Sequence, residues 1–159
     1  MTHLARLCWN SKGWTEPTGE ARKLESNSYA TQTGFGHEEW LFNPEALHEG
    51  WQYGFLQPVS KSRDKLSGKV VDVLLYSIGP KSLRVRVGRL PECQILPVEI
   101  AAAARERYMA SGRLKRMEAQ VQALEGDVGG LRLEDPRWLV NVRFRPETAQ
   151  RFEPLVPVA

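Results

Sequence analysis

The most apolar stretch of the chain, Val70 to Ile78, limits the possible folds more than any other segment. It is rich in β-branched residues and stops at Gly79-Pro80, which favours a central strand. Leu83 to Leu90 then alternates, with leucine or valine at 83, 85 and 87 and arginine at 84 and 86. This period of two predicts a half-buried strand with an arginine face, joined to the first strand by a hairpin.

The apolar period changes after Glu99. Ile100, Ala104 and Tyr108 share one helical face, and Ser111-Gly112 interrupts the pattern. A second helical face then recurs at spacings of three and four up to Gly126, through leucine, methionine and valine at 114, 117, 121 and 124. We expect a helical pair whose apolar stripe packs against the sheet.

Shorter apolar or aromatic segments predict further strands at 4–9, 39–42, 51–59, 92–97 and 138–144. Asn43-Pro44 predicts a capped helical turn, because asparagine caps helices and proline suits the first helical position. Residues 10–32 and 60–69 are polar, and we expect loops there. The order predicts an α+β fold, a small strongly bent sheet or partly open β-barrel flanked by helices, as a single domain over residues 1–159.

Composition narrows the class of partner. The 159 residues carry a net charge of +3 and the isoelectric point is about 9.0, which permits a nucleic-acid partner without requiring one. The two cysteines form no metal-binding motif, and no apolar run is long enough for a bilayer. We therefore expect a cytoplasmic protein with no membrane partner. The Pro- and Val-rich end predicts an extended strand or linker, so we expect one module of a longer protein.

Polar and aromatic residues are densest from Gly34 to Phe42. Two glycines bracket Phe35 and allow close approach of the backbone to a ligand. His37, Glu38 and Trp40 follow, and this combination of side chains is suited to a flat, polar ligand. The alternative is that Phe35 and Trp40 are core residues beside a turn and that the glutamates are solvated.

A nucleobase fits this combination, because carboxylates accept hydrogen bonds from exocyclic amines while aromatic rings stack on the base. The predicted base-binding residues are Trp14, Ser28, Tyr29, Phe35, Gly36, His37, Glu38, Glu39 and Trp40. Basic residues in the polar segments and the last strand predict contacts with the DNA backbone; these are Lys12, Arg22, Lys23, Lys61, Arg63, Arg143 and Arg145. The alternative for each is an ordinary solvated charge.

Catalytic signatures are missing from the sequence. It contains no phosphate-binding glycine loop, no dinucleotide fingerprint and no nucleophile elbow. His37-Glu38-Glu39 has no second histidine at zincin spacing, and neither cysteine has an evident histidine base. We therefore expect a binding module without self-sufficient catalysis, cofactor or metal.

Several segments resemble an N-terminal module found ahead of HNH-type nuclease domains in bacteria. The matching segments are 7–10, 13–14, 27–29, 34–42, 54–59 and 141–146. The order of elements from residue 70 onward also resembles the PUA-like group, which includes EVE, YTH, ASCH and SRA domains. Several of those domains flip a modified base into an aromatic cage. The resemblance implies a module that selects modified double-stranded DNA while a nuclease domain in the same protein cuts it.

The sequence thus predicts the DNA-binding specificity domain of a modification-dependent restriction endonuclease, reading a flipped-out modified base in phage defence. Three alternatives remain open. One is a reader of modified RNA or of a free nucleotide, and another is a small nucleotide-processing enzyme that uses Glu38 or Glu39 as general acid or base. The third is a protein-interaction domain with a tryptophan patch.

Overall fold

The computed structural model describes residues 2–24, 29–61 and 63–158. Within them one open, mixed sheet of seven strands runs in the order β1-β4-β5-β6-β3-β2, with β7 also paired to β5. The strands are β1 (Thr2–Leu7), β2 (Leu47–His48), β3 (Trp51–Gly54), β4 (Val70–Ile78), β5 (Arg84–Ile95), β6 (Val142–Phe144) and β7 (Gln150–Pro157). The prediction of an α+β fold is confirmed.

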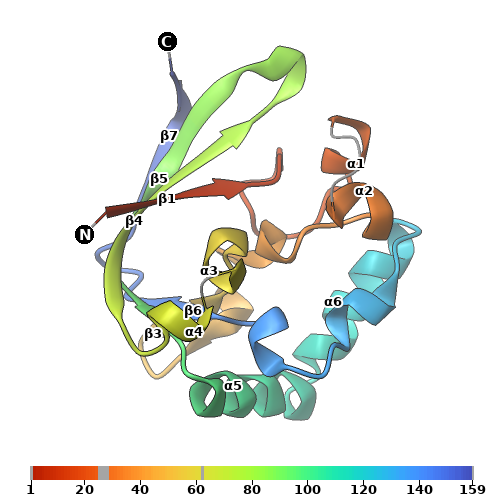
Figure 1. Cartoon of the computed structure of the whole chain (residues 1–159). Helices are drawn as coiled ribbons and strands as arrows, with labels where there is room; N and C mark the ends of the chain where they lie inside the picture. The colour runs from red at the N-terminus through yellow and green to blue at the C-terminus, as the bar shows by residue number, and fades with distance from the viewer. Residues whose placement is uncertain (1, 25–28, 62, 159) are drawn as a thin grey trace.

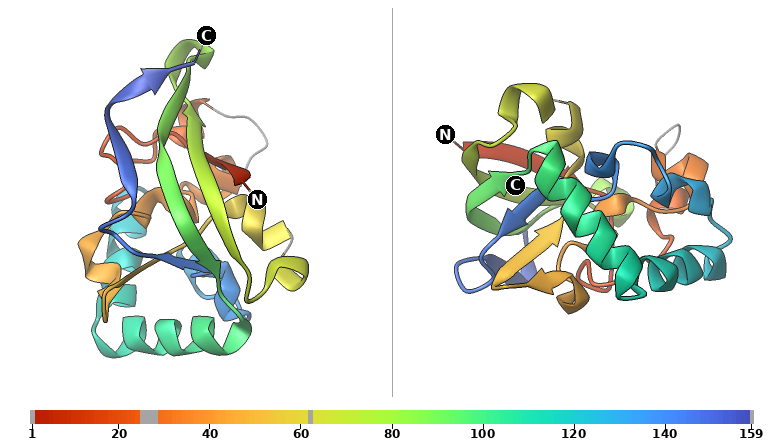
Figure 2. Two further views of the ribbon diagram at one scale, coloured as in Figure 1. Left: turned by 90° about the vertical axis from the view of Figure 1, so that its left-hand side faces the viewer. Right: turned by 90° about the horizontal axis from the view of Figure 1, so that it is seen from below.

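The β4–β5 hairpin is the frame of the molecule, as the sequence predicted. β4 pairs antiparallel with β5 from Val70 opposite Gln94 to Ile78 opposite Arg84, and β1 adds to β4 in parallel. β5 is long enough to pair with two further strands, with β7 along residues 85–89 and with β6 at Gln94 and Ile95. The sheet therefore divides into an upper part around the hairpin and a lower part near the helices (Figures 1 and 2).

Strand β7 bulges away from β5. Arg151 lies opposite Gly88 and Val156 opposite Arg86, so residues 152–155 stand opposite Val87 alone. A bulge bends a strand and interrupts its ladder of hydrogen bonds. Here it opens space between β7 and the inner face of β5.

The helices lie mainly beside the lower part of the sheet (Figure 1). The α-helices are α1 (Ala21–Leu24), α2 (Tyr29–Thr33), α3 (Gln57–Lys61), α4 (Arg63–Leu66), α5 (Val98–Ala110) and α6 (Arg113–Ala123). The 3₁₀ helices are η1 (His37–Trp40), η2 (Pro44–Ala46), η3 (Pro80–Ser82), η4 (Val128–Leu131) and η5 (Pro136–Trp138). The predicted helical pair is α5 and α6, separated at Ser111-Gly112, where Gly112 takes a left-handed backbone (φ 81°). None of the described helices is both long and apolar enough to cross a membrane.

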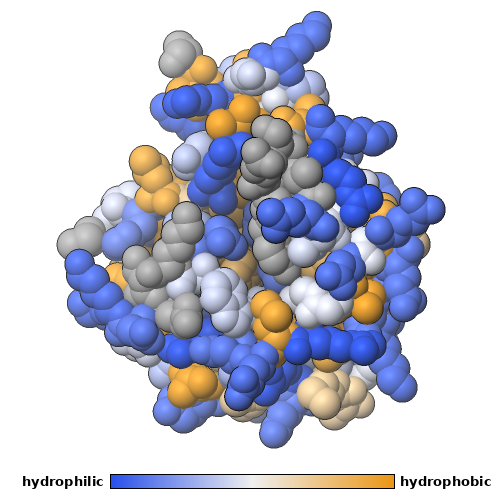
Figure 3. Space-filling view, turned by 45° about the vertical axis from the view of Figure 1, so that its right-hand side comes forward, coloured by the Kyte–Doolittle hydropathy of each residue, from blue (hydrophilic) through white to orange (hydrophobic). Residues whose placement is uncertain are grey.

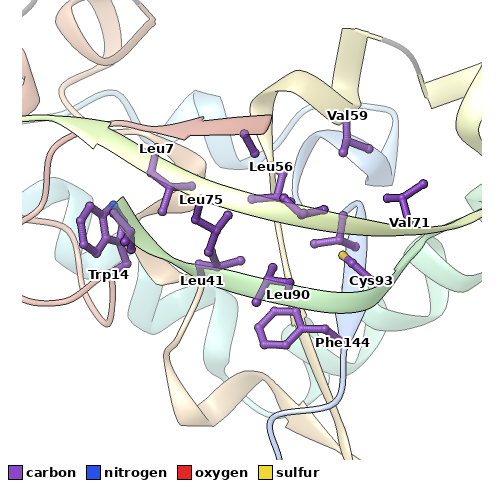
Figure 4. Packing of buried hydrophobic residues seen from close by; sticks show 14 of the residues in the cluster. Leu7, Trp14, Leu41, Leu56, Val59, Val71, Leu75, Leu90, Cys93 and Phe144 are labelled. Atoms are coloured by element: carbon purple, nitrogen blue, oxygen red, sulfur yellow. The ribbon is translucent and has the colours of Figure 1, made fainter. Parts of the chain in front are cut away.

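Two apolar clusters form the core. The first joins the inner face of β4 and β5 to side chains from β1, β6 and the segments between strands, among them Leu7, Leu41 and Phe144. Figure 4 shows Trp14 at one end of this cluster, beside Leu7. The second cluster joins α5 and α6 to β3 and to η1, through residues such as Tyr53, Tyr108 and Trp40. Segment 35–42 contributes to both clusters.

Two strand predictions are wrong or too long because local chemistry favours helical turns. Residues 39–42 were expected as a strand, but residues 37–40 form η1. The predicted strand 51–59 ends at Gly54, and α3 follows with Pro58 in its first turn, where proline is tolerated.

Three further boundaries differ from expectation. The predicted strand 138–144 shortens to β6, because Asp135 caps η5 by accepting a hydrogen bond from the Arg137 amide. Segment 92–97 continues β5 as far as Ile95 instead of forming a separate strand. The predicted loops contain α1 and α2 (residues 10–32) and α3 and α4 (residues 60–69). The predicted turn at Asn43-Pro44 is confirmed as η2, capped by Asn43.

Candidate functional site

The segment that the sequence singled out lies inside the protein. Phe35, His37, Glu38, Glu39 and Trp40 are each between 0 and 6 % exposed. The Phe35 ring makes edge contacts with the rings of His37 and Trp40, at centroid distances of 5.2 and 5.7 Å. These residues are brought together, but within the core.

Both buried glutamates bind polar groups of the N-terminal loop. Glu38 Oε1 accepts a hydrogen bond from the Cys8 amide at 3.0 Å. Glu39 Oε1 accepts from Asn10 Nδ2 at 3.1 Å and from the Thr18 amide at 3.0 Å, and its Oε2 accepts from the Gly36 amide at 3.0 Å. Consecutive residues of a strand face opposite sides, so only the tight 3₁₀ turn lets both carboxylates reach this loop.

Burial sets the protonation of this segment. Desolvation raises the pKa of Glu39, partly opposed by the hydrogen bonds from Thr18, Gly36 and Asn10. Desolvation also lowers the pKa of His37 to about 4, although its hydrogen bond to Gly130 opposes the shift. His37 is therefore neutral at pH 7, and its Nε2–H donates to the Gly130 carbonyl at 2.7 Å.

The carboxylates of Glu38 and Glu39 hold in place the loop from Cys8 to Thr18. Asn10 organises it, since its Oδ1 accepts from the amides of Lys12 at 2.8 Å and Trp14 at 3.1 Å. Its Nδ2 also donates to the Glu16 carbonyl at 2.7 Å. Trp14 takes a left-handed backbone (φ 57°) that is uncommon for a bulky residue. Its Nε1–H donates to the Cys8 carbonyl at 2.8 Å, which fixes the indole.

This loop and the β7 bulge enclose a hollow of about 420 Å³. Three aromatic residues from separate segments, Trp9, Phe42 and Phe152, line it together with Trp14. The Trp9 and Trp14 rings meet edge to face, 6.3 Å apart at 86°. The remaining lining residues are Asn10, Ser11, Lys12, Gly13, Val87, Arg151, Glu153, Pro154 and Leu155. The hollow therefore has apolar, mostly flat walls with several polar groups among them.

Arg151 links the two sides of the hollow. Its Nη2 donates to the Gly13 carbonyl at 3.1 Å, and its guanidinium lies 4.6 Å from the centre of the Phe42 ring. Glu153 lies 3.8 Å away. Lys12 is 3.1 Å from Glu16 on the exposed part of the loop. Two cations thus stand beside an aromatic hollow, which suits a flat ring attached to an anionic group.

The other predicted residues lie in different places. Arg22 and Lys23 are in α1, and Arg22 donates to the Glu125 carbonyl at 3.5 Å. Arg143 and Arg145 lie in and just after β6, where both stack on Trp51. Ser28 lies outside the described residues, and only the backbones of Tyr29, Lys61 and Arg63 are placed, in α2, α3 and α4. Of all the predicted residues, Trp14 and Lys12 line the hollow. Trp14 is only 2 % exposed, because most of its side chain packs in the first core cluster.

Sequence reasoning missed Trp9, Phe42 and Arg151 as site residues. Phe42 ends the segment that the sequence singled out and Trp9 ends a predicted strand, and their aromatic character was a usable signal. Arg151 gave no local signal, because its place depends on the pairing of β7 with β5. The bulge that forms one wall is likewise a feature of strand pairing.

Comparisons with protein-family models, with curated proteins and with solved structures found no match. Among the residues that the structure describes, no group of three or more histidine, cysteine or acidic side chains could hold a metal ion.

Proposed function

We propose that the protein is a DNA-binding module that accommodates a flipped-out, modified base in the hollow between the Trp9–Trp14 loop and β7. The observation that carries the proposal is the aromatic lining of this hollow, with Trp9, Phe42 and Phe152 and the edge of the buried Trp14 around one space of about 420 Å³. The proposal keeps the predicted function but moves the base from the Gly34–Trp40 segment to the loop which that segment supports.

The energetics of base flipping favour such a lining. Removing a base from the duplex costs a few kcal/mol. Stacking on aromatic side chains returns about 1–3 kcal/mol per base. Lys12 and Arg151 line the hollow, and adjoining phosphates would compete with Glu16 and Glu153 for them. A volume of this size also leaves room for a substituent on the base. Selection of a modified base would then follow from apolar contact with that substituent.

The proposal includes two finer expectations drawn from the resemblance. One is a PUA-like identity of the α+β fold, and the other is a nuclease domain that cuts the DNA selected by this module. A cytoplasmic location also remains part of the proposal. The isoelectric point of about 9.0 is compatible with a DNA partner. Figure 3 shows one largely hydrophilic face with apolar residues scattered over it.

The enzyme alternative has no specific observation in its favour. The oxygens of Glu38 and Glu39 that would serve as acid or base accept hydrogen bonds from Cys8, Asn10, Thr18 and Gly36. The alternative of modified RNA or a free nucleotide uses the same hollow, and we treat it as an outcome of the experiment below.

The test is a binding titration with matched DNA duplexes, unmodified or carrying one of a panel of modified cytosines and adenines. We expect tighter binding to one modified duplex. Trp9→Ala should weaken that binding about tenfold by removing one stacking surface, and Ser11→Trp should block the hollow from its exposed rim. Trp138→Ala, which alters a half-buried tryptophan in η5 away from the hollow, is the matched control.

Equal affinity for all duplexes, unaffected by Trp9→Ala and Ser11→Trp, would overturn the proposal. If a modified RNA or mononucleotide bound more tightly than any duplex, the hollow would be assigned to that ligand and the DNA proposal would be overturned. Turnover of a nucleotide, abolished by Glu38→Gln or Glu39→Gln, would restore the enzyme alternative.

A further inference from the structure

Five alternating cationic and aromatic side chains form a stack across the lower part of the sheet and α5. In order they are Arg145, Trp51, Arg143, Tyr53 and Arg107, hereafter the arginine stack. The guanidinium carbons of Arg145 and Arg143 lie 3.6 and 4.4 Å from the centre of the Trp51 ring. Those of Arg143 and Arg107 lie 6.0 and 4.9 Å from the centre of the Tyr53 ring.

The strand pairing builds this arrangement. β3 and β6 pair antiparallel, with Gln52 opposite Phe144 and Tyr53 opposite Arg143. Phe144 points into the core, so its neighbours Arg143 and Arg145 point the other way. Arg107 reaches the same aromatic row from the last turn of α5. Three cations from two elements are thereby gathered on one face.

None of the three arginines has a carboxylate within 4.0 Å among the described residues. Some arginines elsewhere do have one; Arg116 and Arg137 are 3.0 and 2.8 Å from Glu45 and Asp135. The stack thus concentrates uncompensated positive charge in a protein whose net charge is only +3.

The stack also retains hydrogen-bonding capacity. Arg107 Nη2 is buried and has no partner in the described structure. Arg107 and Tyr53 line a hollow of about 430 Å³ together with His48 and Glu45, and the Glu45 carboxylate is paired with Arg113 and Arg116. Arg143 uses only two of its five N–H groups, donating from Nε to Gln94 at 2.8 Å and from Nη1 to the Tyr53 hydroxyl at 3.1 Å. Arg145 is exposed.

We propose that the arginine stack binds the phosphodiester backbone of nucleic acid, an inference that rests on the proposed function. Guanidinium groups bind phosphate oxygens through paired N–H donors. Stacking on Trp51 and Tyr53 holds these groups in place before binding, which lowers the entropy lost on association. The stack ends at Arg145, six residues before Arg151 at the hollow, and a turn closed by the Thr148 and Ala149 amides on the Arg145 carbonyl joins them.

The test measures the salt dependence of binding to an unmodified duplex, which does not require a base in the hollow. Each phosphate contact contributes about 0.9 to the slope of log affinity against log salt. The double variant Arg107→Gln/Arg145→Gln should therefore lower the slope by about 2 and weaken binding at low salt. Arg116→Gln/Arg132→Gln removes two exposed, carboxylate-paired arginines and is the matched control, expected to leave the slope unchanged.

The variant Arg145→Lys distinguishes a phosphate contact from a structural role of Arg145. Lysine keeps the positive charge but lacks the planar guanidinium that stacks on Trp51. We expect it to retain the salt slope and to lose part of the affinity. An unchanged slope in the glutamine double variant, with the fold intact by circular dichroism, would overturn the proposal. An equal drop in slope for the two double variants would overturn it too.

Failure of this proposal and failure of the proposed function give different results. The variants Trp9→Ala and Ser11→Trp of the hollow change the preference for a modified base without changing the slope on unmodified DNA, whereas variants of the arginine stack do the reverse. A further experiment adds inorganic phosphate to the complex at constant ionic strength. Complete displacement of the duplex would show that the arginine stack binds a single phosphate group, and would overturn the assignment to a polymer backbone.

Discussion

The Gly34–Trp40 segment and the Trp9–Trp14 loop have similar compositions but differ in how far they are exposed to solvent. Both combine glycine and aromatic residues with polar side chains. In the first, every residue is buried and Glu38 and Glu39 bind internal donors. In the second, Asn10 and Trp14 are buried, but Trp9 is half-buried, Ser11 and Lys12 are exposed, and the loop lines a hollow.

The difference shows that the Gly34–Trp40 segment supports the Trp9–Trp14 loop. Glu38 and Glu39 satisfy the amide of Cys8, the amide of Thr18 and the side chain of Asn10, which leaves the tryptophans of the loop fixed around an open space. Supporting residues of this kind are what a precise binding site needs. We therefore expect substitutions in the first segment to affect stability and substitutions in the second to affect binding.

Glu39→Ala should have the largest effect on stability. It leaves the buried amide of Gly36 and the half-buried amide of Thr18 without an acceptor, at about 2 and about 1 kcal/mol, so we expect a loss of about 3 kcal/mol in the free energy of unfolding. Urea denaturation measures it, and Glu106→Ala on the exposed face of α5 is the control, with a change of less than about 0.5 kcal/mol. A loss of less than about 1 kcal/mol for Glu39→Ala would remove the distinction between the two regions.

His37 should make stability depend on pH. The unfolded state takes up a proton near the ordinary pKa of histidine, while the folded state resists protonation until about pH 4. Stability from this group is therefore full above about pH 6.5 and is lost as the pH falls towards 4, by about 3 kcal/mol in all.

The raised pKa of Glu39 acts in the opposite sense. The folded state binds its proton more tightly, so the stability from this group falls as the pH rises above the ordinary pKa of glutamate. The measurement is therefore the difference in unfolding free energy between the unsubstituted protein and His37→Phe, from pH 4 to 7. A difference that does not vary with pH would contradict burial of a neutral His37.

Arg151→Met should have the smallest effect on stability and a clear effect on binding. It removes the hydrogen bond to the Gly13 carbonyl and the contact with the Phe42 ring, together about 1 kcal/mol. Because this arginine joins the loop to β7, affinity for the preferred duplex should fall several-fold. Arg151→Lys should recover part of the affinity. If Arg151→Met destabilised the fold as much as Glu39→Ala, the hollow would belong to the core.

The sequence by itself determined the α+β class, the β4–β5 hairpin, the helical pair α5 and α6, and the cap at Asn43. These features follow from interactions between residues close in the chain, such as the period of two in β5 and the bond from the Glu45 amide to Asn43. Composition also identified the regions where aromatic and polar residues gather.

Only the tertiary structure decided which of those residues are open to a ligand. Glu38 and Glu39 are buried because their partners lie 21 to 30 residues away in the N-terminal loop. The hollow exists because β7, at the far end of the chain, bulges opposite Val87 and brings Arg151 to Gly13. Contacts of this range depend on the packing of the whole chain, and a local pattern carries no record of them.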